Sequence, residues 1–325
     1  MNGAPVSINY LSLFSGIEAA SCAWQDLPFN PVGFSEVEPF PCNVLRKHYP
    51  HVPNLGDIEK ITIEQLHSLG RIDLIVGGSP CQGFSTAGLK KGLDDERSKL
   101  ALCYVSVIAS VRPRWFLWEN VPGCLRTNGG LDFRCFVGTL VKLGYDVSWR
   151  VLDAQYFGVS QQRKRVFLVG YYGDWRRPAQ VLFERQGLQG NTAQSTGEEQ
   201  GITADVESLV RSASPDLSFD MTHACDVLRY YFKHTPTLTA HMGTGGNNVP
   251  LVLGRVRDNS LQLRKLTPSE CLQLQGFPRD WFNNVEGRSD TAAYKAIGNS
   301  MAVPVMRWIG QRIYAVEASR YLQED

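Results

Sequence analysis

The chain has little net charge, no long apolar run and no paired cysteine motif. Its 325 residues carry 33 Lys and Arg and 32 Asp and Glu, so the formal net charge is +1. Nucleic-acid contacts must therefore come from local basic clusters, such as 161–165 and 255–265. The longest uncharged apolar-rich run, 100–111, is too short to span a bilayer, and residues 1–10 lack the features of a secretory signal. We expect a soluble, intracellular protein.

The eight cysteines are scattered, and none forms a Cys-x-x-Cys pair. A chain of this length can build a core without disulfides, and scattered cysteines are typical of reduced, cytoplasmic proteins. His223 and Cys225 have no partners at the spacing of metal ligands, so no metal site is predicted. The cysteines are Cys22, Cys42, Cys81, Cys103, Cys124, Cys135, Cys225 and Cys271.

Apolar strands alternate with helical segments through the first half of the chain. Strands are predicted at 8–14, 31–38, 72–78, 114–121, 146–153 and 165–172. Helices are predicted between them at 16–27, 40–49, 98–111 and 133–144. The strands are continuously apolar, which indicates a sheet covered on both faces. The pattern predicts an α/β fold with a doubly wound, mostly parallel sheet.

The character of the sequence changes after residue 172. Residues 186–219 are polar and rich in Gly, Gln, Ser and Thr, which predicts a flexible connection. Residues 226–256 mix aromatic, basic and Gly-Asn-rich pieces, which predicts a second, smaller domain of short strands and loops. The pattern is helical again towards the end. We divide the chain into a first domain at 1–172, a variable domain at 173–262 and a C-terminal segment at 263–325.

Cys81 lies in "GGSPCQGFS", directly after the predicted strand 72–78. Loops at strand ends are where α/β proteins place catalytic groups. A thiolate near backbone N–H groups and cations is a competent nucleophile, whereas most isolated cysteines are inert core residues. The position of Cys81, more than its residue type, therefore favours a catalytic role.

Three further residues are candidates to assist such a nucleophile. Glu119 ends the predicted strand 114–121, where burial would raise its pKa and let it donate a proton; a solvated or helix-capping carboxylate is the alternative. Arg163 and Arg165 stand two residues apart at the start of the last strand, so both are expected on one side, pointing into the site. A solvated basic edge is the alternative for them.

The first strand–helix turn, 13–21, is where such a fold binds a nucleotide-like cofactor. It lacks the complete Gly-x-Gly-x-x-Gly pattern, because Gly16 is followed by Glu18 and two alanines. Glu36, 20 residues after Gly16, lies at the end of the second predicted strand, where it can accept hydrogen bonds from ribose hydroxyls. Asp57 could hold an adenine amino group in the same pocket.

Considered together, these segments resemble the motifs of DNA cytosine-5 methyltransferases in order and spacing. They are "SLFSGIEAAS", "GFSEVEPF", "GDI", "GGSPCQGFS", "DERSKL", "LWENVPG", "YFGVSQQRKRVFLVG", "RKLTPSECLQLQGFP" and "AIGNSMAVPV". The resemblance runs from about residue 8 to 322 and is interrupted by the variable region. It implies a class I, Rossmann-like methyltransferase of bacterial or phage-like type, acting in the bacterial cytoplasm or a phage-infected cell.

The resemblance also implies a mechanism. Cys81 matches the nucleophile that adds to cytosine C6, and Glu119 matches the residue that engages N3 and the exocyclic amine. Arg165 matches the arginine that contacts the cytosine and the glutamate, with Arg163 beside it. The methyl group comes from S-adenosylmethionine, and the base must be flipped out of the duplex.

Cofactor and DNA residues are carried over in the same way. The cofactor-binding residues implied are Phe14, Gly16, Glu36, Asp57, Ile58, Pro80, Leu100, Asn299 and Ser300. Because Asn299 and Ser300 come from far along the chain, the C-terminal segment is expected to return to the first domain. The variable region would be the target-recognition domain, and the DNA-binding residues implied are Gln82, Ser85, Thr237, Leu238, Thr239, Gly245 and Gly246. The turn "GIEAA" departs from relatives that have more glycine.

The implied partner is double-stranded DNA, bound by a monomer without a metal, in a restriction-modification or a protective role. A cognate endonuclease would act separately. A transfer-RNA cytosine-5 methyltransferase is the closest alternative, although the long variable region favours an enzyme that recognises duplex DNA. A catalytically inactive DNA-binding module is a second alternative, against which Cys81, Glu119 and the two arginines speak. An exocyclic-amine methyltransferase would need an Asp/Asn/Ser-Pro-Pro-aromatic motif where this chain has "SPCQ".

Overall fold

The structure is a computed structural model. It describes residues 6–79, 96–183, 217–220, 229–232, 234–244, 248–255 and 261–321. Nearly all of the segment expected to be flexible, 186–219, lies outside these ranges.

A six-stranded sheet forms the centre of the molecule, with strand order β2-β1-β3-β4-β6-β5. The strands are β1 (Ile8–Leu13), β2 (Phe29–Ser35), β3 (Leu74–Gly77), β4 (Trp115–Asn120), β5 (Tyr145–Asp153) and β6 (Lys164–Tyr172). The first four pair in parallel, whereas β6 is antiparallel to both β4 and β5. The β5–β6 link is too short for a parallel crossover, which requires antiparallel pairing. The predicted fold class, with a mostly parallel sheet, is confirmed.

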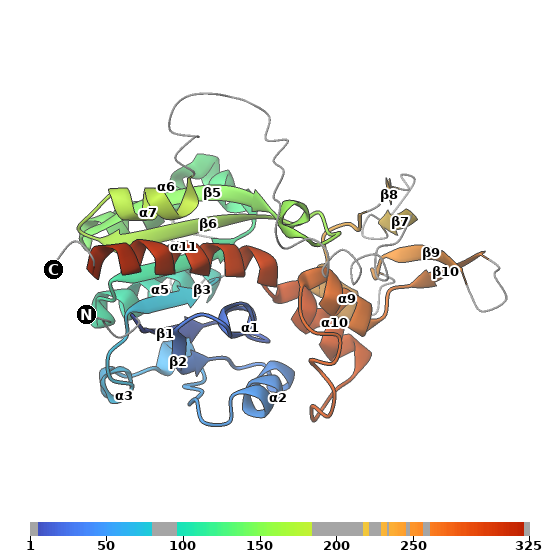
Figure 1. Cartoon of the computed structure of the whole chain (residues 1–325), viewed down its shortest axis with the longest axis horizontal. Helices are drawn as coiled ribbons and strands as arrows, with labels where there is room; N and C mark the ends of the chain where they lie inside the picture. The colour runs from blue at the N-terminus through green and yellow to red at the C-terminus, as the bar shows by residue number, and fades with distance from the viewer. Residues whose placement is uncertain are drawn as a thin grey trace.

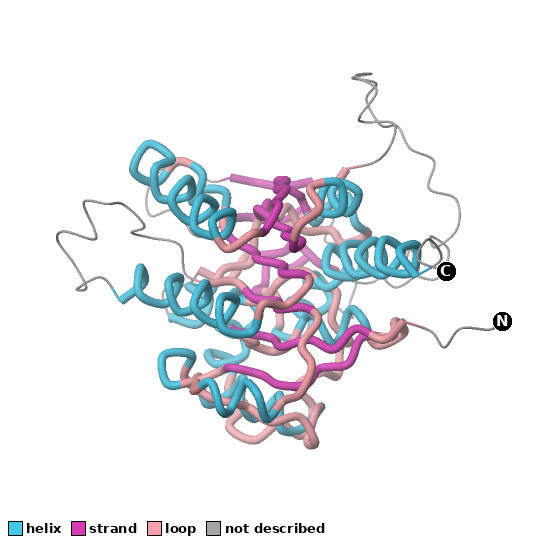
Figure 2. Tube along the Cα trace, turned by 90° about the vertical axis from the view of Figure 1, so that its left-hand side faces the viewer, coloured by secondary structure: helices cyan, strands magenta, loops and turns pink. Residues whose placement is uncertain are grey.

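Helices cover both faces of this sheet, as Figure 2 shows. The helices are α1 (Ala19–Trp24), α2 (Pro39–His48), α3 (Ile63–Ser68), α5 (Glu96–Val111), α6 (Leu131–Lys142), α7 (Arg176–Leu182), α9 (Pro268–Gln275), α10 (Asp290–Asn299) and α11 (Val303–Tyr321). Successive residues of a strand point to opposite faces. Accordingly, Trp115 and Leu117 of β4 join the apolar core beneath α1 and α11, while Phe116 and Trp118 join the core beneath α5 and α6.

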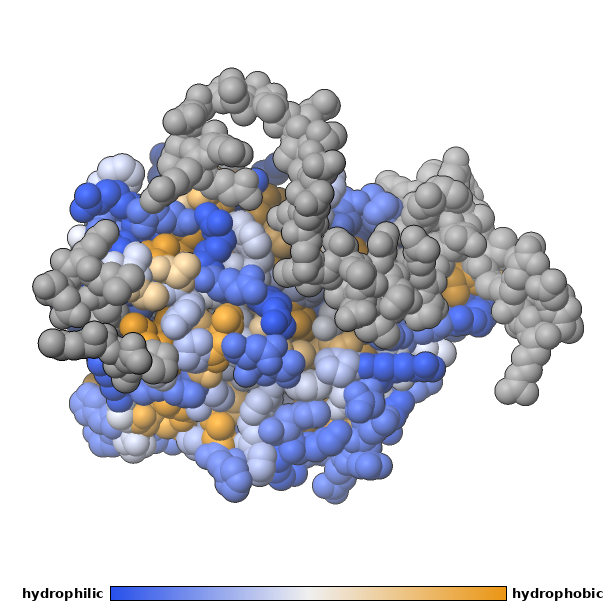
Figure 3. Space-filling model, viewed as in Figure 1, coloured by the Kyte–Doolittle hydropathy of each residue, from blue (hydrophilic) through white to orange (hydrophobic). Residues whose placement is uncertain are grey.

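Apolar side chains are concentrated in these two cores. In the view of Figure 3 the described surface is largely hydrophilic, with its apolar residues in scattered patches. None of the described helices is long and apolar enough to cross a membrane.

A second, smaller sheet lies beside α9 and α10 (Figure 1). Its strands β7 (Leu217–Asp220), β8 (Arg229–Phe232), β9 (Leu251–Arg255) and β10 (Leu261–Lys265) pair antiparallel in the order β10-β9-β7-β8. The described chain after β8 returns to the central-sheet region at Thr235, whose backbone N–H donates to the Ser160 carbonyl at 2.8 Å. Strands β8 and β9 lie in the region 226–256, in which short strands were predicted. Strand β7 overlaps the end of the segment 186–219, which was predicted to be flexible, and β10 begins after residue 256.

The C-terminal segment packs on the central sheet. Helix α9 begins with a capping box, because Thr267 and Glu270 bond each other's backbone N–H groups. Helix α11 lies against α1 and α7 (Figure 1). Trp24 Nε1 of α1 donates to the Met306 carbonyl at 2.7 Å. At the far end of α11, the buried Glu317 accepts from Trp115 Nε1 at 2.9 Å.

Candidate active site

The turn after β1 is tight and left-handed. Phe14, Gly16 and Glu18 have φ of 53°, 56° and 62°, a region that non-glycine residues rarely adopt. Nothing lies within 4 Å of a Cβ built on Gly16, so this position faces open space. The Gly16 N–H donates to Glu36 Oε2 at 2.7 Å. Glu36 and the turn therefore form one unit.

Glu36 and Asp57 are held by a shared loop. The second oxygen of Glu36, Oε1, accepts from the N–H groups of Val37 and Glu38 at 2.9 and 2.8 Å. Asn54 Oδ1 accepts from the N–H groups of Glu36 and Gly56 at 3.0 and 3.1 Å, which draws the loop before Asp57 to the end of β2. The structure thus brings Glu36 and the loop before Asp57 together at the same end of the sheet.

Three apolar residues that were predicted to bind the cofactor pack in the same hydrophobic core. Ile58 is buried, and Phe14 and Leu100 are partly buried against the same cluster of side chains. Leu100 comes from α5, and Ile58 from the short 3-10 helix Ile58–Lys60, which Asp57 caps by accepting from the Glu59 N–H at 3.1 Å. The predicted residues therefore meet from three elements.

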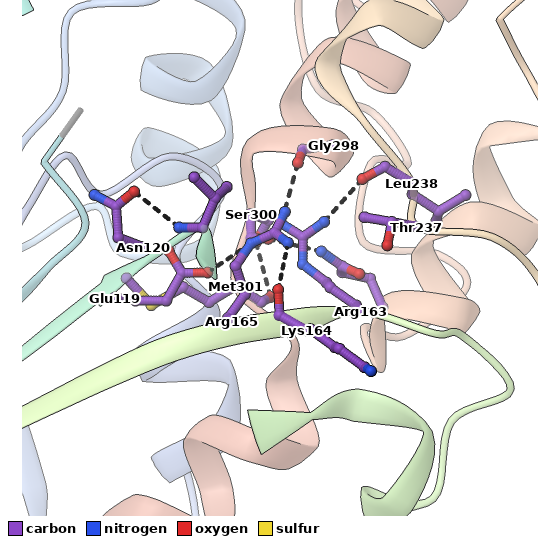
Figure 4. A network of polar contacts seen from close by, with 12 residues as sticks. Glu119, Asn120, Arg163, Lys164, Arg165, Thr237, Leu238, Gly298, Ser300 and Met301 are labelled. Atoms are coloured by element: carbon purple, nitrogen blue, oxygen red, sulfur yellow. Dashed lines mark hydrogen bonds and ion pairs between the residues drawn. The ribbon is translucent and has the colours of Figure 1, made fainter. Parts of the chain in front are cut away.

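Glu119 lies near the end of β4, next to the strand that leads to Cys81. Its Oε1 is 3.1 Å from Arg165 Nε, an ion pair whose angles do not make a hydrogen bond, so this buried oxygen accepts none. Burial raises the pKa of Glu119, and the nearby Arg165 and then Arg163 oppose the increase. Gly78 is needed here, because a Cβ at this position would lie 3.1 Å from Glu119 Oε2. Figure 4 shows Arg165 directed at Glu119.

The residues on either side of Glu119 hold the chain just before Cys81. Trp118 Nε1 donates to Ser79 Oγ at 2.9 Å, and Asn120 Nδ2 donates to the Ser79 carbonyl at 2.6 Å. Cys81 itself lies outside the described residues. The same is true of Pro80, Gln82, Ser85, Gly245 and Gly246.

Arg163 does not point at an open site as expected. Its guanidinium is buried and donates to the carbonyls of Leu238, Gly298 and Ser300 at 2.8, 3.1 and 2.6 Å (Figure 4). Arg163 precedes β6, so the alternation that would place it beside Arg165 does not apply to it. Burial, with the nearby Arg165, lowers its pKa, and Glu119 opposes this. Arg163 therefore joins three distant segments behind the site.

Two buried glutamines, which the sequence analysis did not select, complete this junction. Gln161 Nε2 donates to Gln275 Oε1 at 2.6 Å, and Gln161 Oε1 accepts from the Leu238 N–H at 3.1 Å. Gln275 Nε2 donates to the Ser300 carbonyl at 2.7 Å. The motifs "SQQRKR" and "CLQLQGF" contain both residues, but only the fold shows that they meet.

The segment 237–239 is packed against this junction. Leu238 is fully buried and both its backbone polar groups are bonded within the protein, so the DNA-binding role expected for it does not fit this structure. Thr237 Oγ1 donates to the Gln162 carbonyl at 2.5 Å. Thr239 Oγ1 is buried without a hydrogen-bond partner.

A pocket opens at the carboxyl ends of β1, β3 and β4. Its lining residues are Ser12, Leu13, Phe14, Ser15, Gly16, Glu18, Ala19, Ala20, Val76, Gly78, Glu119, Asn299, Ser300 and Met301. The pocket brings together Phe14, Gly16, Asn299 and Ser300 of the predicted cofactor residues with Glu119. It also includes Glu18, which the sequence analysis treated only as a departure from glycine. An acid inside the otherwise apolar run around "SGIEAAS" is the signal that could have selected it.

Fold and site together define the class: a doubly wound α/β fold with a buried acid beside the turn after β1. Two solved structures resemble the chain in fold. S. pombe Dnmt2 methyltransferase has a TM-score of 0.69, 20% identity and coverage of 96% of this chain and 99% of that one. The Entamoeba histolytica methyltransferase EhMeth has a TM-score of 0.65, 18% identity and coverage of 95% and 98%.

The family follows from sequence. The family model described as C-5 cytosine-specific DNA methylase matches residues 8–315, and the chain belongs to this family. The enzyme is thus a DNA (cytosine-5-)-methyltransferase, as the motifs predicted. It is similar to "Type II methyltransferase M.Bsp6I" of Bacillus sp. (strain RFL6), with 30% identity over 93% of this chain and 97% of that protein.

A second relative carries a different name. The chain is 31% identical to "DNA N-6-adenine-methyltransferase" of Escherichia phage P1 over 94% of its own length. It spans only 61% of that protein's length.

Proposed function

We propose that the protein transfers a methyl group from S-adenosylmethionine to C5 of a flipped-out cytosine in a specific duplex DNA sequence, through a covalent Cys81–C6 adduct. The observation that carries this proposal is the buried Glu119. Its Oε1 accepts no hydrogen bond, Arg165 holds it, and it lines the same pocket as the turn after β1. Its neighbours in β4 bind the residue that precedes Pro80 and Cys81.

The chemistry assigned to these groups follows from their surroundings. The Cys81 thiolate attacks C6, which makes C5 electron-rich enough to accept a methyl group. Because burial raises its pKa, Glu119 keeps a proton closer to neutral pH and can donate it to cytosine N3. Arg165 holds Glu119 in place. Loss of the C5 proton then expels Cys81 and restores the thiolate.

The pocket suits the cofactor. S-adenosylmethionine supplies an electrophilic methyl group on a positively charged sulfur, and the described residues that line the pocket include no Lys or Arg to repel that charge. The open space beside Gly16 admits a ligand close to the backbone, and Glu36 lies 2.7 Å from that backbone N–H. Phe14, Asp57, Ile58, Leu100, Asn299 and Ser300 would complete the site from the elements described above.

The smaller sheet would read the DNA. Strands β7, β8 and β9 lie in the variable region 173–262, and β10 extends just beyond it to Lys265. The connection of the sheet to the site runs through the segment that contains Thr237 and Thr239. We assign DNA contacts to Gly245 and Gly246, whereas Thr237 and Thr239, which pack against the junction, would hold the connecting segment in place. The relatives named as Type II methyltransferases support a restriction-modification or a protective role. We further propose that the protein acts as a monomer in the cytoplasm and that any endonuclease acts separately.

Adenine methylation, named for the phage P1 relative, is not proposed for this chain. The strand β3 leads into "SPCQ", which has a nucleophile where an exocyclic-amine methyltransferase needs Pro-aromatic. Cytosine C5 requires such a nucleophile, whereas an exocyclic amine does not.

The test combines product analysis with trapping. Purified protein, DNA and methyl donor should yield 5-methylcytosine and no N6-methyladenine in digested duplex DNA, and transfer RNA should stay unmodified. A duplex with 5-fluorocytosine at the target should form a covalent complex with the wild type but not with Cys81→Ser. Methyl transfer at the wild-type rate by Cys81→Ser would overturn the mechanism.

The cofactor assignment has its own test. Glu36→Ala should weaken S-adenosylmethionine binding by about tenfold, because the loss of a charged hydrogen-bond acceptor costs about 1.5 kcal/mol. Calorimetry measures this directly, with Glu64→Gln on the exposed face of α3 as the control. Equal affinity of Glu36→Ala and the control would refute this role.

A further inference from the structure

Glu18 is a buried carboxyl that the proposed mechanism does not use. Glu18 is only 1% exposed to solvent, yet it lines the same pocket as Glu119. Its oxygens accept from Ser12 Oγ at 2.8 Å, Ser21 N at 3.1 Å and Ser21 Oγ at 3.0 Å. All these donors are neutral. Among the described residues no Lys, Arg or His forms an ion pair with Glu18.

The groups that face Glu18 from neighbouring elements add no positive charge. Glu36, at the end of β2, is a like charge, and the remaining neighbours are Tyr10 of β1, Tyr49 after α2 and Cys22 of α1. Burial raises the pKa of each of these last three groups, so they are uncharged at neutral pH.

Helix α11 packs against α1 and brings one cation to this region. Arg307 faces Cys22, and its guanidinium pairs with Asp26 at 3.0 Å on the surface. Arg307 therefore does not neutralise the charge of Glu18 directly. The described part of the pocket therefore has an excess of acidic groups over basic ones.

An acidic, desolvated pocket selects for positive charge in its ligand. S-adenosylmethionine has a sulfonium, whereas its demethylated product has a neutral thioether in the same place. We propose that Glu18 is a specificity-determining residue whose ionised carboxyl favours the sulfonium donor over the thioether product, so that donor binding releases its proton to solvent. This deepens the proposed function and rests on it.

The local structure supports this role. Burial raises the pKa of Glu18 to about 7, so the carboxyl is close to half protonated at neutral pH and responds to a nearby charge. After methyl transfer the sulfur loses its charge, and Glu18 takes a proton back from solvent. The product is then held less tightly than the donor, which aids its release.

The substitution Glu18→Gln removes the charge and keeps the shape. The amide oxygen can still accept from Ser21, and the hydroxyl of Ser12 can accept from the amide nitrogen instead of donating. Glu18→Gly is a second variant, because the left-handed φ of 62° suits glycine. Glu64→Gln, an exposed change of the same charge on α3, is the matched control.

The experiment is calorimetry of donor and product binding to the full chain between pH 6 and pH 8, in two buffers of different ionisation enthalpy. The wild type and the control should release about half a proton on donor binding at pH 7 and less on product binding. Their donor-to-product affinity ratio should rise with pH. In Glu18→Gln and Glu18→Gly that ratio should be about tenfold lower at pH 8 and independent of pH, as expected for loss of one pKa unit of coupling.

The outcomes separate two failures. If the wild type binds no donor, the proposed cofactor is wrong and this inference falls with it. If the donor binds but no proton is released, only the role of Glu18 is overturned. Glu119 lines the same pocket. Proton release that persists in both Glu18 variants would show that another group, such as Glu119, releases the proton, and this would also overturn the inference.

Discussion

Replacing Arg163 with Met tests the buried junction behind the active site. The guanidinium of Arg163 donates to three backbone carbonyls that lie 75 to 137 residues away in sequence. Methionine fills a similar volume but donates no hydrogen bond. The substitution therefore removes the guanidinium that donates hydrogen bonds to both segments, 237–239 and 298–300.

The expected loss in the free energy of unfolding depends on which of the three carbonyls still accept a hydrogen bond in the variant. The Ser300 carbonyl still accepts from Gln275 Nε2 at 2.7 Å, whereas those of Leu238 and Gly298 lose the donor from Arg163. A buried carbonyl left without a donor costs about 1–3 kcal/mol, so two cost about 2–6 kcal/mol. Removal of a desolvated charge offsets part of this. We expect the free energy of unfolding to fall by about 3 kcal/mol.

Urea denaturation at pH 7, followed by tryptophan fluorescence, measures this change. The matched control is Arg150→Met, since the exposed Arg150 donates one hydrogen bond, to the Leu182 carbonyl at 3.0 Å. Its loss should cost less than about 1 kcal/mol. Equal transition midpoints and slopes for the two variants would show that the Arg163 junction contributes no more than a surface contact.

Three further changes give distinct readouts. Glu119→Gln should lower methyl transfer at least about a hundredfold with little change in donor affinity, and a rate within a factor of two of wild type would exclude proton donation by Glu119. Gly298→Ala places a Cβ 2.1 Å from the Thr239 backbone and should destabilise the fold by several kcal/mol, measured by thermal unfolding against Gly138→Ala, whose Cβ meets nothing within 4 Å. The pKa of Glu18 is raised from 4.5 to about 7, so the folded state binds more protons and its stability falls by about 3 kcal/mol as pH rises through that interval. Glu18→Gln should flatten this part of the pH dependence, and parallel profiles for variant and wild type would contradict it.

Much of the fold was predictable because its signals are local. All six central strands lie close to their predicted ranges, since continuous apolar runs between turn residues identify strands of a covered sheet. The predicted helix 16–27 is shorter in the structure, Ala19–Trp24, because Phe14 to Glu18 form a left-handed turn instead. The direction of β6 was not predictable from periodicity, which is the same for parallel and antiparallel strands.

The site was predictable only in part. The spacing of Gly16 and Glu36 placed both residues at one pocket, because they follow adjacent parallel strands, but the hydrogen bond between them was not predicted. Strand alternation placed Arg163 in the open site, and the family resemblance assigned Leu238 to DNA. Both assignments failed to anticipate burial, since no local pattern shows which carbonyls a long side chain will meet.

The sequence by itself indicated the six central strands, the helices between them and the family, and it supplied the candidate residues for the chemistry. Each of these depends on residue type and on spacing along the chain. Tertiary structure alone decided that Glu18 is buried without an ion pair to any described cation, that Glu119 Oε1 lies beside Arg165 without accepting a hydrogen bond, and that Arg163 and Gln275 bind the same carbonyl. The physical reason is that desolvation and hydrogen-bond partners are set by groups that folding brings from distant positions, and these set the pKa and the role of each side chain.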